Sequence, residues 1–345
     1  MIKDEVLRSF SGKNAAVTGG TGMIGRQVVD ILCATGANVR IISLDQVCVH
    51  AKAEHVFGDL TNFELCKQVT RDMDFVFHIA GVKGSAKVSR PMLASHIVPT
   101  LMFNTNVLEA CRVNRVKKAV YTSSISAYAD AEVFREGDNP NASPVDSGWA
   151  KRMGEIQIYA YKVQYGLENF AIVRPSNVYG PGDNFDPENA MVVASLMARI
   201  HRKEDPLVVW GDGSAIRDIV YSRDVAEGCI LALYHGTKGG FVNLGSGREV
   251  SIQQLVEALR SFLTFNYSFD ARKPSGWPRR VMDIALARKM IDYNPSTPLA
   301  EGLKQTWEWY LAHQEEYKLK KNYFQEQVSA SAARGSCLGE KNSGE

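Results

Sequence analysis

The sequence predicts an α/β protein with a doubly wound parallel sheet and a smaller C-terminal α/β lobe. Short apolar segments, typical of buried parallel strands, alternate with helical segments as far as about residue 175. The first strand, Ala15-Ala16-Val17, runs through a glycine-rich stretch, TGGTGMIG (18–25), into apolar residues at helical spacing. Such a turn directs backbone N–H groups and the positive end of a helix at one point, which suits a pyrophosphate. These observations predict a Rossmann-type sheet with a dinucleotide site.

The glycine-rich stretch has its glycines three residues apart, at Gly19, Gly22 and Gly25, in place of the commoner GxGxxG spacing. Its context favours a dinucleotide site over a plain tight turn. A strand precedes it, a helix follows it, and a second strand comes about 20 residues on.

The second strand, residues 38–45, should end at the adenosine ribose of the dinucleotide. An acid there favours NAD, because it accepts hydrogen bonds from both ribose hydroxyls and repels a 2′-phosphate. The expected position holds Ser43, Asp45 follows two residues later, and Arg26 stands just after the last glycine. Serine with a nearby arginine favours NADP slightly, although Asp45 can still reach the ribose and Arg26 can equally be a solvated helix residue. The predicted cofactor is NAD or NADP, with a slight preference for NADP.

Four further strands complete the predicted sheet, and they end in polar or small residues. The third ends near Asp59, which could accept a hydrogen bond from an adenine amino group or cap the helix that opens at Thr61-Asn62. The fourth ends at Ala80-Gly81, where backbone can approach a ligand closely. His78 within that strand is more often a satisfied core histidine than a catalyst. The strands are expected at 55–60, 75–81, 119–124 and 170–174, and long helices at 91–114 and 149–165.

After Pro175 the pattern loosens into a long loop, NVYGPGDNFDPEN (177–189), and such a loop beside a site is more often functional than idle. We divide the chain into a dinucleotide-binding domain (1–175), whose sheet a later segment near 216–247 extends, a substrate-binding lobe (176–325) and a disordered tail (326–345). The lobe should contain helices at 190–202, 251–262 and 299–312 and strands at 207–210 and 241–243.

The composition is that of an ordinary globular protein. Of 345 residues 45% are hydrophobic, and a net charge of +2 gives no electrostatic reason to expect nucleic acid as a partner. No run of about 20 apolar residues could span a membrane, and the N-terminus lacks the apolar core of a signal peptide. The six cysteines lack metal-ligand spacing, so we expect reduced thiols, no metal site and a cytoplasmic location.

A series of motifs then occurs in a fixed order along the chain. They are TGGTGMIG (18–25), GDL (58–60), HIAG (78–81), YTSS (121–124), Lys151, RPSNVYGP (174–181), RDIVYSRDVA (217–226) and NLGSG (243–247). With them, residues 12–315 resemble an extended short-chain dehydrogenase/reductase of the NAD-dependent epimerase/dehydratase, nucleotide-sugar-modifying type. The NVYGP-DNF-EN segment and KPSGWPRR (273–280) are most similar to the branch that contains GDP-fucose synthase.

The resemblance implies a catalytic Ser or Thr and a YxxxK pair that act on a sugar hydroxyl or ketone. The tyrosine transfers the proton, and the lysine lowers its pKa and holds the nicotinamide ribose. Ser124 matches the hydroxyl and Lys151 the lysine, but Ser147 stands where the tyrosine belongs, and an alcohol is a much poorer acid or base than a phenol. Three explanations remain open: Ser147 relays a proton through water, a nearby tyrosine such as Tyr128 replaces the missing one, or the usual redox chemistry has been lost.

Two further catalytic positions of the fucose-synthase branch also differ. Its cysteine position corresponds to Ser126 and its histidine position to Met191. A serine and a thioether do not readily shuttle protons as a thiol and an imidazole do, so fucose synthase activity itself is not expected. Dehydration is disfavoured as well, because Ile125-Ser126 follow the active-site hydroxyl where a dehydratase of this superfamily carries Asp-Glu.

The resemblance also implies the binding residues. Arg217 and the pair Arg279-Arg280 are similar to the family's phosphate contacts, which guanidinium groups make bidentately, although the pair could also be a solvated loop. Trp210 could stack on a base or fill the lobe. The cofactor residues are then Gly19, Thr21, Gly22, Met23, Ile24, Gly25, Ser43, Asp45, Asp59, Leu60, Ala80, Gly81, Thr122, Lys151, Pro175, Asn177 and Val178. The substrate residues are Lys83, Ser124, Asn177, Met191, Trp210, Arg217, Arg279 and Arg280.

We therefore expect an NAD(P)-dependent epimerase or reductase that transfers hydride at a carbon, taken to be C4, of a nucleotide-activated sugar, with a GDP-sugar weakly favoured. Two alternatives remain: a reductase of a small keto compound, and a cofactor-loaded binding or regulatory protein without turnover. Helices 91–114 and 149–165 are expected to form the face of a homodimer, as is usual for relatives.

Overall fold

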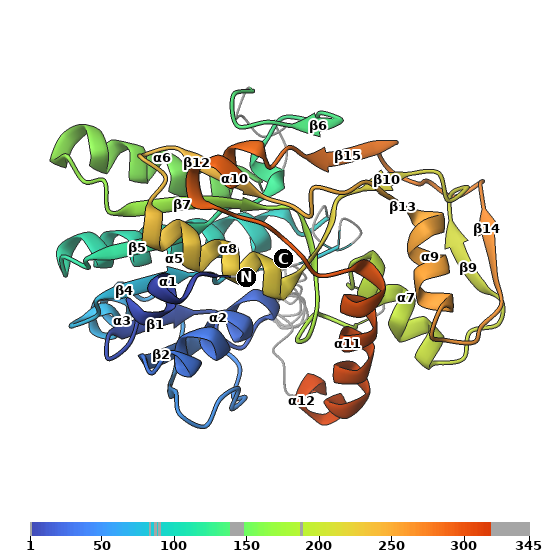
Figure 1. Cartoon of the computed structure of the whole chain (residues 1–345), viewed down its shortest axis with the longest axis horizontal. Coiled ribbons are helices and arrows are strands. Elements are labelled where there is room, and N and C mark those ends of the chain that lie inside the picture. Colours follow the sequence, from blue (N-terminus) through green and yellow to red (C-terminus); the bar gives the residue numbers. More distant parts are fainter. Residues whose placement is uncertain are drawn as a thin grey trace, which may run out of the picture.

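The computed structural model describes residues 2–82, 84–85, 88, 91–138, 148–186 and 189–318, and it has the predicted doubly wound α/β architecture. At its centre lies a seven-stranded parallel sheet in the order β12-β7-β5-β4-β1-β2-β3 (Figure 1). The strands are β1 (Asn14–Thr18), β2 (Asn38–Ser43), β3 (Glu54–Phe57), β4 (Phe75–His78), β5 (Lys118–Thr122), β7 (Phe170–Pro175) and β12 (Phe241–Leu244). The strand order reverses between β1 and β4, and in such sheets ligands bind at the carboxyl ends beside this point.

Helices cover both faces of this sheet. Hydrophobic clusters join one face to α2 (Met23–Ala34) and α8 (Ser222–His235), and the other face to α3 (Phe63–Thr70), α5 (Leu93–Val113) and α6 (Gly148–Tyr165). Every residue of β7 is buried, which explains why this strand is a continuous apolar run interrupted only by Arg174. Strands β1 to β5 and β7 follow the sequence prediction because their apolar patterns specify them. The strand expected at 241–243 in the smaller lobe is instead β12, at the edge of the central sheet.

The smaller lobe, at the right of Figure 1, has a hydrophobic cluster of its own. α7 (Val192–His201), α9 (Ile252–Arg260) and α11 (Leu299–Ala312) contribute to it with β9 (Leu207–Trp210), which pairs in parallel with β14 (Tyr267–Asp270). Phe185 stacks on Tyr310 of α11 with ring centroids 4.1 Å apart. Phe185 lies in the loop that follows β8 (Asn177–Tyr179), so this stacking anchors the loop to α11.

The structure also contains a four-stranded sheet that the sequence did not predict. It consists of β13 (Val250–Ser251), β10 (Ile216–Arg217), β15 (Arg279–Met282) and β6 (Val133–Phe134), in that order. Three of these strands have only 2 residues each, which is too short for an alternating pattern to be recognised. The sequence prediction also lacks β11 (Ile219–Tyr221), which pairs with β8. It lacks three short helices as well, α1 (Asp4–Arg8), α10 (Ala285–Ile291) and α12 (Gln314–Lys318).

Across the described residues, no helix is both long enough and apolar enough to traverse a membrane. The same residues contain no cluster of three His, Cys, Asp or Glu side chains that could hold a metal ion.

Candidate functional site

The glycine-rich loop has the geometry of a dinucleotide cradle. Gly19 has a φ of +67°, and a Cβ there would lie 2.8 Å from the Cα of Ala80 at the end of β4. A Cβ on Gly25 would lie 2.2 Å from the Gly19 carbonyl oxygen, while Gly22 N–H donates to that same oxygen at 3.0 Å. Side chains are therefore excluded at Gly19 and Gly25, and α2 begins directly after Gly22 with its N–H groups facing the loop.

At the end of β2 the predicted ribose residues have partners. The Ser43 hydroxyl is buried, donates to the Asp45 carbonyl at 3.0 Å and lies 2.8 Å from His55 Nε2. The Asp45 carboxylate accepts a hydrogen bond from the Thr21 hydroxyl at 2.9 Å, which joins the strand end to the glycine loop. Asp45 is thus held beside the glycine-rich loop at the end of β2, where a carboxylate suits the hydroxyls of a ribose.

The interpretation of Arg26 as a solvated helix residue is wrong. Its side chain is 8% exposed, and its guanidinium donates to the Thr21 carbonyl at 3.0 Å and to Glu316 of α12 at 2.5 Å. It also lies 4.7 Å from the ring centroid of Trp309. Residues of the C-terminal segment, which the sequence alone did not link to Arg26, bury and neutralise this charge. Arg26 therefore no longer supports a preference for NADP.

The Asp59 side chain has a local role in the structure. Its carboxylate accepts a hydrogen bond from Thr61 N–H at 2.9 Å, and the neighbouring Asn62 side chain caps α3. Leu60, also predicted to touch the cofactor, is buried beneath this turn. Asn62, and not Asp59, is therefore the N-cap of α3, so the interpretation of Asp59 as that cap is wrong, and the adenine contact remains a prediction.

Lys151 lies at the carboxyl ends of two adjacent strands. From α6 its ammonium donates to the Thr122 carbonyl at 2.9 Å, at the end of β5, and to the Ala80 carbonyl at 3.4 Å, just after β4. A Cβ on Gly81 would lie 3.6 Å from the ammonium. Burial lowers the pKa of Lys151 to about 8, so the group exchanges a proton near neutral pH. The structure thus brings together the predicted residues 80, 81, 122 and 151.

Ser124 and Ser126 share a short turn at the end of β5. The Ser126 hydroxyl donates to the Ser124 hydroxyl oxygen at 2.9 Å, and Ser126 N–H donates to the same oxygen at 3.1 Å, at the start of the short 3₁₀-helix Ile125–Ala127. Gly148 begins α6 in contact with this turn, because a Cβ there would lie 1.8 Å from the Ser126 carbonyl oxygen. Ser147 and Lys83 lie outside the described residues, so their predicted roles remain predictions.

A buried ion pair beneath this turn was not found from the sequence. Arg174 of β7 donates to the two carboxylate oxygens of Glu155 at 2.8 and 2.6 Å, and Ser123 donates to Glu155 at 2.5 Å. Arg152 adds a fourth hydrogen bond at 2.9 Å. Glu155 stands four residues after Lys151 on α6, so its spacing could have indicated a shared helix face. The pair fixes Ser123, next to the predicted catalytic serine, against the helix that carries Lys151.

Tyr128 does not replace the missing tyrosine, so this explanation is wrong. Its ring is buried, its hydroxyl donates to Asn243 Oδ1 at 2.9 Å, and the Arg174 guanidinium lies 4.0 Å from its ring centroid. Burial raises the pKa of Tyr128, which makes its hydroxyl a weaker acid than an exposed phenol. Its aromatic ring and hydroxyl are both committed to the protein core.

The prediction that His78 is a core histidine is confirmed. Its ring nitrogens lie 2.8 Å from the Thr18 hydroxyl and 2.9 Å from the side-chain oxygen of Asn104. Burial, reinforced by the charge of Lys151, lowers the pKa of His78 to about 3. Asn104 in turn donates to Tyr121, whose hydroxyl donates to the Lys151 carbonyl at 2.9 Å. This buried chain of hydrogen bonds connects β1 with the backbone of Lys151.

Among the predicted substrate residues, Asn177 donates a hydrogen bond from its side-chain amide to the Asp218 carbonyl at 2.9 Å. Of its neighbours predicted to contact the cofactor, Pro175 is buried and Val178 is half-buried. Met191 is exposed at the start of α7, two residues after Asn189. The interpretation of Trp210 as a lobe-filling residue is wrong, because its side chain is 55% exposed at the end of β9.

The three predicted phosphate arginines lie on neighbouring strands. The register pairs Arg217 of β10 with Arg280 of β15, so these two are cross-strand neighbours, while alternation sends Arg279 to the opposite face. Arg279 is ion-paired with Glu249. Arg217 donates to the carbonyls of Ser275 and Trp277, and burial together with Arg280 lowers its pKa. Only Arg217 and Arg280 are thus placed as a pair.

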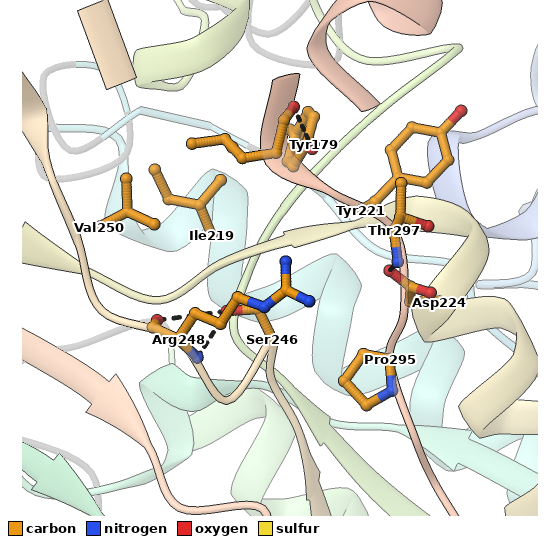
Figure 2. A pocket seen from close by; sticks show the side chains of 10 residues that line it. Tyr179, Ile219, Tyr221, Asp224, Ser246, Arg248, Val250, Pro295 and Thr297 are labelled. Carbon is orange, nitrogen blue, oxygen red and sulfur yellow. Dashed lines mark hydrogen bonds between the residues drawn. The ribbon is translucent and has the colours of Figure 1, made fainter. Parts of the chain in front are cut away.

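A separate small pocket lies between the end of β11 and the segment that leads into α11. Figure 2 shows the Arg248 side chain reaching into it, and the Asp224 carboxylate accepts hydrogen bonds from Ser296 and Thr297 N–H at its edge. None of the predicted site residues lines this pocket. Its lining consists of Tyr179, Ile219, Tyr221, Asp224, Ser246, Arg248, Val250, Pro295, Thr297 and Leu299.

Known proteins are similar to this chain in architecture and in sequence. The NAD dependent epimerase/dehydratase family matches residues 15–245. GDP-L-fucose synthase 1 of Arabidopsis thaliana is 32% identical over 320 residues, covering 88% of this chain and 96% of its own. The structure of UDP-glucose 4-epimerase with UDP-glucose from Thermotoga maritima has a TM-score of 0.76 and 28% identity, over 87% of this chain and 99% of its own. A GDP-L-fucose synthetase from Naegleria fowleri bound to NADP has a TM-score of 0.75 and 25% identity, over 88% and 94% of the two chains.

Proposed function

This chain belongs to the NAD-dependent epimerase/dehydratase family, and from that premise we propose that it is an NAD(P)-dependent epimerase or reductase of a nucleotide-activated sugar. Its reaction is hydride transfer at a sugar carbon, C4 being the expected position, in an active site without the usual tyrosine. The observation that carries the proposal is the placement of the Lys151 ammonium between the ends of β4 and β5, next to the cradle at Gly19.

The residues present fit the dinucleotide. The cradle at Gly19 and Gly25 leaves room only for backbone, and the N–H groups that begin α2 suit its pyrophosphate. Asp45 is held beside the loop for a ribose, and Lys151 would hold the nicotinamide ribose. When bound, the nicotinamide supplies the hydride chemistry. A charged carboxylate at the ribose would favour NAD over NADP.

The chain's own groups would handle the proton. Ser124 would polarise the reacting sugar oxygen, and its hydroxyl already accepts two hydrogen bonds that fix its orientation. Lys151, with its pKa lowered to about 8, can hold or release a proton at Nζ near neutral pH. With Tyr128 excluded, we take Ser147, acting through water, as the replacement for the missing tyrosine.

The substrate half of the proposal rests on Arg217 and Arg280. As cross-strand neighbours they place two positive groups side by side, which suits the two phosphates of a nucleotide diphosphate. Relatives act on GDP- and UDP-sugars, so binding measurements must identify the base. The NVYGP-DNF-EN and KPSGWPRR segments favour GDP weakly.

We also propose a homodimer through α5 and α6. The two helices pack side by side and leave apolar side chains exposed along their outer surface, a pattern that marks an interaction site. The exposed residues are Val98, Met102 and Val113 on α5 and Met153, Ile156, Tyr159, Val163 and Tyr165 on α6.

Absorbance of the purified protein near ~340 nm, where a carried hydride is detected, tests the enzymatic proposal. The protein is loaded with NAD(H) or NADP(H) and titrated with GDP-, UDP- and dTDP-sugars. A band that appears or bleaches with one sugar supports hydride transfer and identifies the substrate class. Bound dinucleotide with no response to any sugar favours the second candidate, a binding or regulatory protein, for which the absent tyrosine is the motivating observation.

A further inference from the structure

Arg26 is an unusual residue because a charged group at the start of a cofactor-binding helix is almost completely buried. Its side chain is 8% exposed, and its Nε lies buried without a hydrogen-bond partner among the described residues. A Cβ on Gly182, which has a φ of +80°, would lie 2.3 Å from that Nε, so the backbone of the loop after β8 covers the guanidinium directly. Burying a charge in this way is costly unless it is paired.

The partners of Arg26 come from the far end of the chain. Glu316 of α12 accepts from Nη2 at 2.5 Å across a sequence separation of 290 residues, and its side chain is 18% exposed. The Trp309 ring of α11 lies 4.7 Å from the guanidinium carbon and supplies a cation–π contact. The C-terminal helices therefore supply both the counter-charge and the aromatic face.

On its other side Arg26 acts on the glycine loop. The same Nη2 donates to the Thr21 carbonyl at 3.0 Å, while the Thr21 hydroxyl donates to Asp45 at 2.9 Å. Thr21 is thus held at its carbonyl and at its side chain. A continuous series of polar contacts runs from the carboxylate at the end of β2, through the loop, to α12.

We propose that Arg26, Glu316 and Trp309 form a C-terminal latch that holds the glycine loop in its binding conformation. Glu316 and Trp309 are positioning residues: they act on the loop only through Arg26. The latch rests on the proposed dinucleotide site and adds to it that α11 and α12 determine how tightly the dinucleotide is held. A loop ordered before binding loses less conformational entropy when the ligand arrives.

The test uses Glu316→Gln in the full chain, with Glu308→Gln on an exposed face of α11 as the matched control. Dissociation constants and dissociation rates are measured with NADH and NADPH by fluorescence. Hydrogen exchange of residues 18–26 is measured in the absence of dinucleotide. We expect Glu316→Gln to weaken binding about tenfold, mainly through faster dissociation, and to raise exchange in the loop. Glu308→Gln should change neither, and Glu316→Asp should recover part of the affinity because the charge is retained.

Equal affinity and equal loop exchange in Glu316→Gln and the wild type overturn the latch while leaving the dinucleotide site intact. A wild-type protein that binds neither dinucleotide overturns the proposed function and the latch together. If Glu316→Gln lowers thermal stability but leaves the dissociation rate unchanged, the pair is merely structural and the latch is rejected. Arg26→Gln provides a second variant, which should weaken binding as Glu316→Gln does.

Discussion

Removing the buried carboxylate of Glu155 is predicted to destabilise the protein by about 3–5 kcal/mol, the cost of breaking a buried ion pair from one side. The side chains of Arg174 and Glu155 are 0% and 1% exposed. Hydrogen bonds from Ser123, Arg152 and Arg174 converge on the two carboxylate oxygens. Glutamine preserves the shape of the side chain but has one acceptor oxygen and no charge, so the Arg174 guanidinium would lose its charged partner.

Urea unfolding of Glu155→Gln should give a lower midpoint, and a thermal scan should show a loss on the order of 10 °C. The double variant Glu155→Leu/Arg174→Met should recover most of the lost stability, because both fully buried charges are removed, and Arg152, the remaining charge that loses a partner, has a side chain that is 19% exposed. Glu308→Gln, on the surface, should stay within about 0.5 kcal/mol of the wild type. A Glu155→Gln protein within about 1 kcal/mol of the wild type, the range of exposed pairs, would show that this buried ion pair contributes no more than a surface pair.

Three further predictions concern the lysine, the cradle and the dimer. In the folded protein the pKa of Lys151 is lowered to about 8 from 10.5, so the unfolded chain binds more protons between these pH values. The free energy of unfolding should therefore rise with pH across this window. Urea unfolding of Lys151→Met at several pH values should show a weaker dependence of stability on pH. Gly25→Ala places a Cβ 2.2 Å from a loop carbonyl and should abolish NADH binding by fluorescence, whereas Gly137→Ala, where a Cβ meets nothing within 4 Å, should bind normally. Val163→Glu, at a position 67% exposed on α6, should shift the sedimenting species from dimer to monomer, and Leu311→Glu should not; a dimeric Val163→Glu would contradict the proposed interface.

The sequence predicted the parts of the fold that local patterns specify. A continuous apolar strand such as β7 and the glycine loop before α2 each carry their own signal within a few residues, because burial and backbone conformation decide them locally. The four-stranded sheet has no such signal, since its strands come from four separate parts of the chain and three have only 2 residues.

In the candidate site too, residues that stand in local motifs were predicted from the sequence, whereas contacts between distant residues were not. Lys151 and the glycines were found because they stand in recognisable motifs, and the structure gives them matching contacts. The burial of Arg26 depends on residues far away in the sequence, Gly182, Trp309 and Glu316, so its interpretation from neighbouring residues is wrong. Tyr128 was proposed as a replacement for the tyrosine from closeness in sequence, whereas its side chain is turned into the core toward Asn243.

The proposed function rests on the claim that hydride transfer occurs without the usual tyrosine. Mass spectrometry tests this directly: the nucleotide sugar that changes the absorbance is labelled with deuterium at C4 and added to protein that carries stoichiometric oxidised dinucleotide, NAD+ or NADP+. We predict that the nicotinamide gains deuterium from the sugar in the wild type and that the rate falls strongly in Lys151→Met. Bound dinucleotide that gains no deuterium from any labelled sugar would contradict the claim and favour a protein that binds its ligands without turnover.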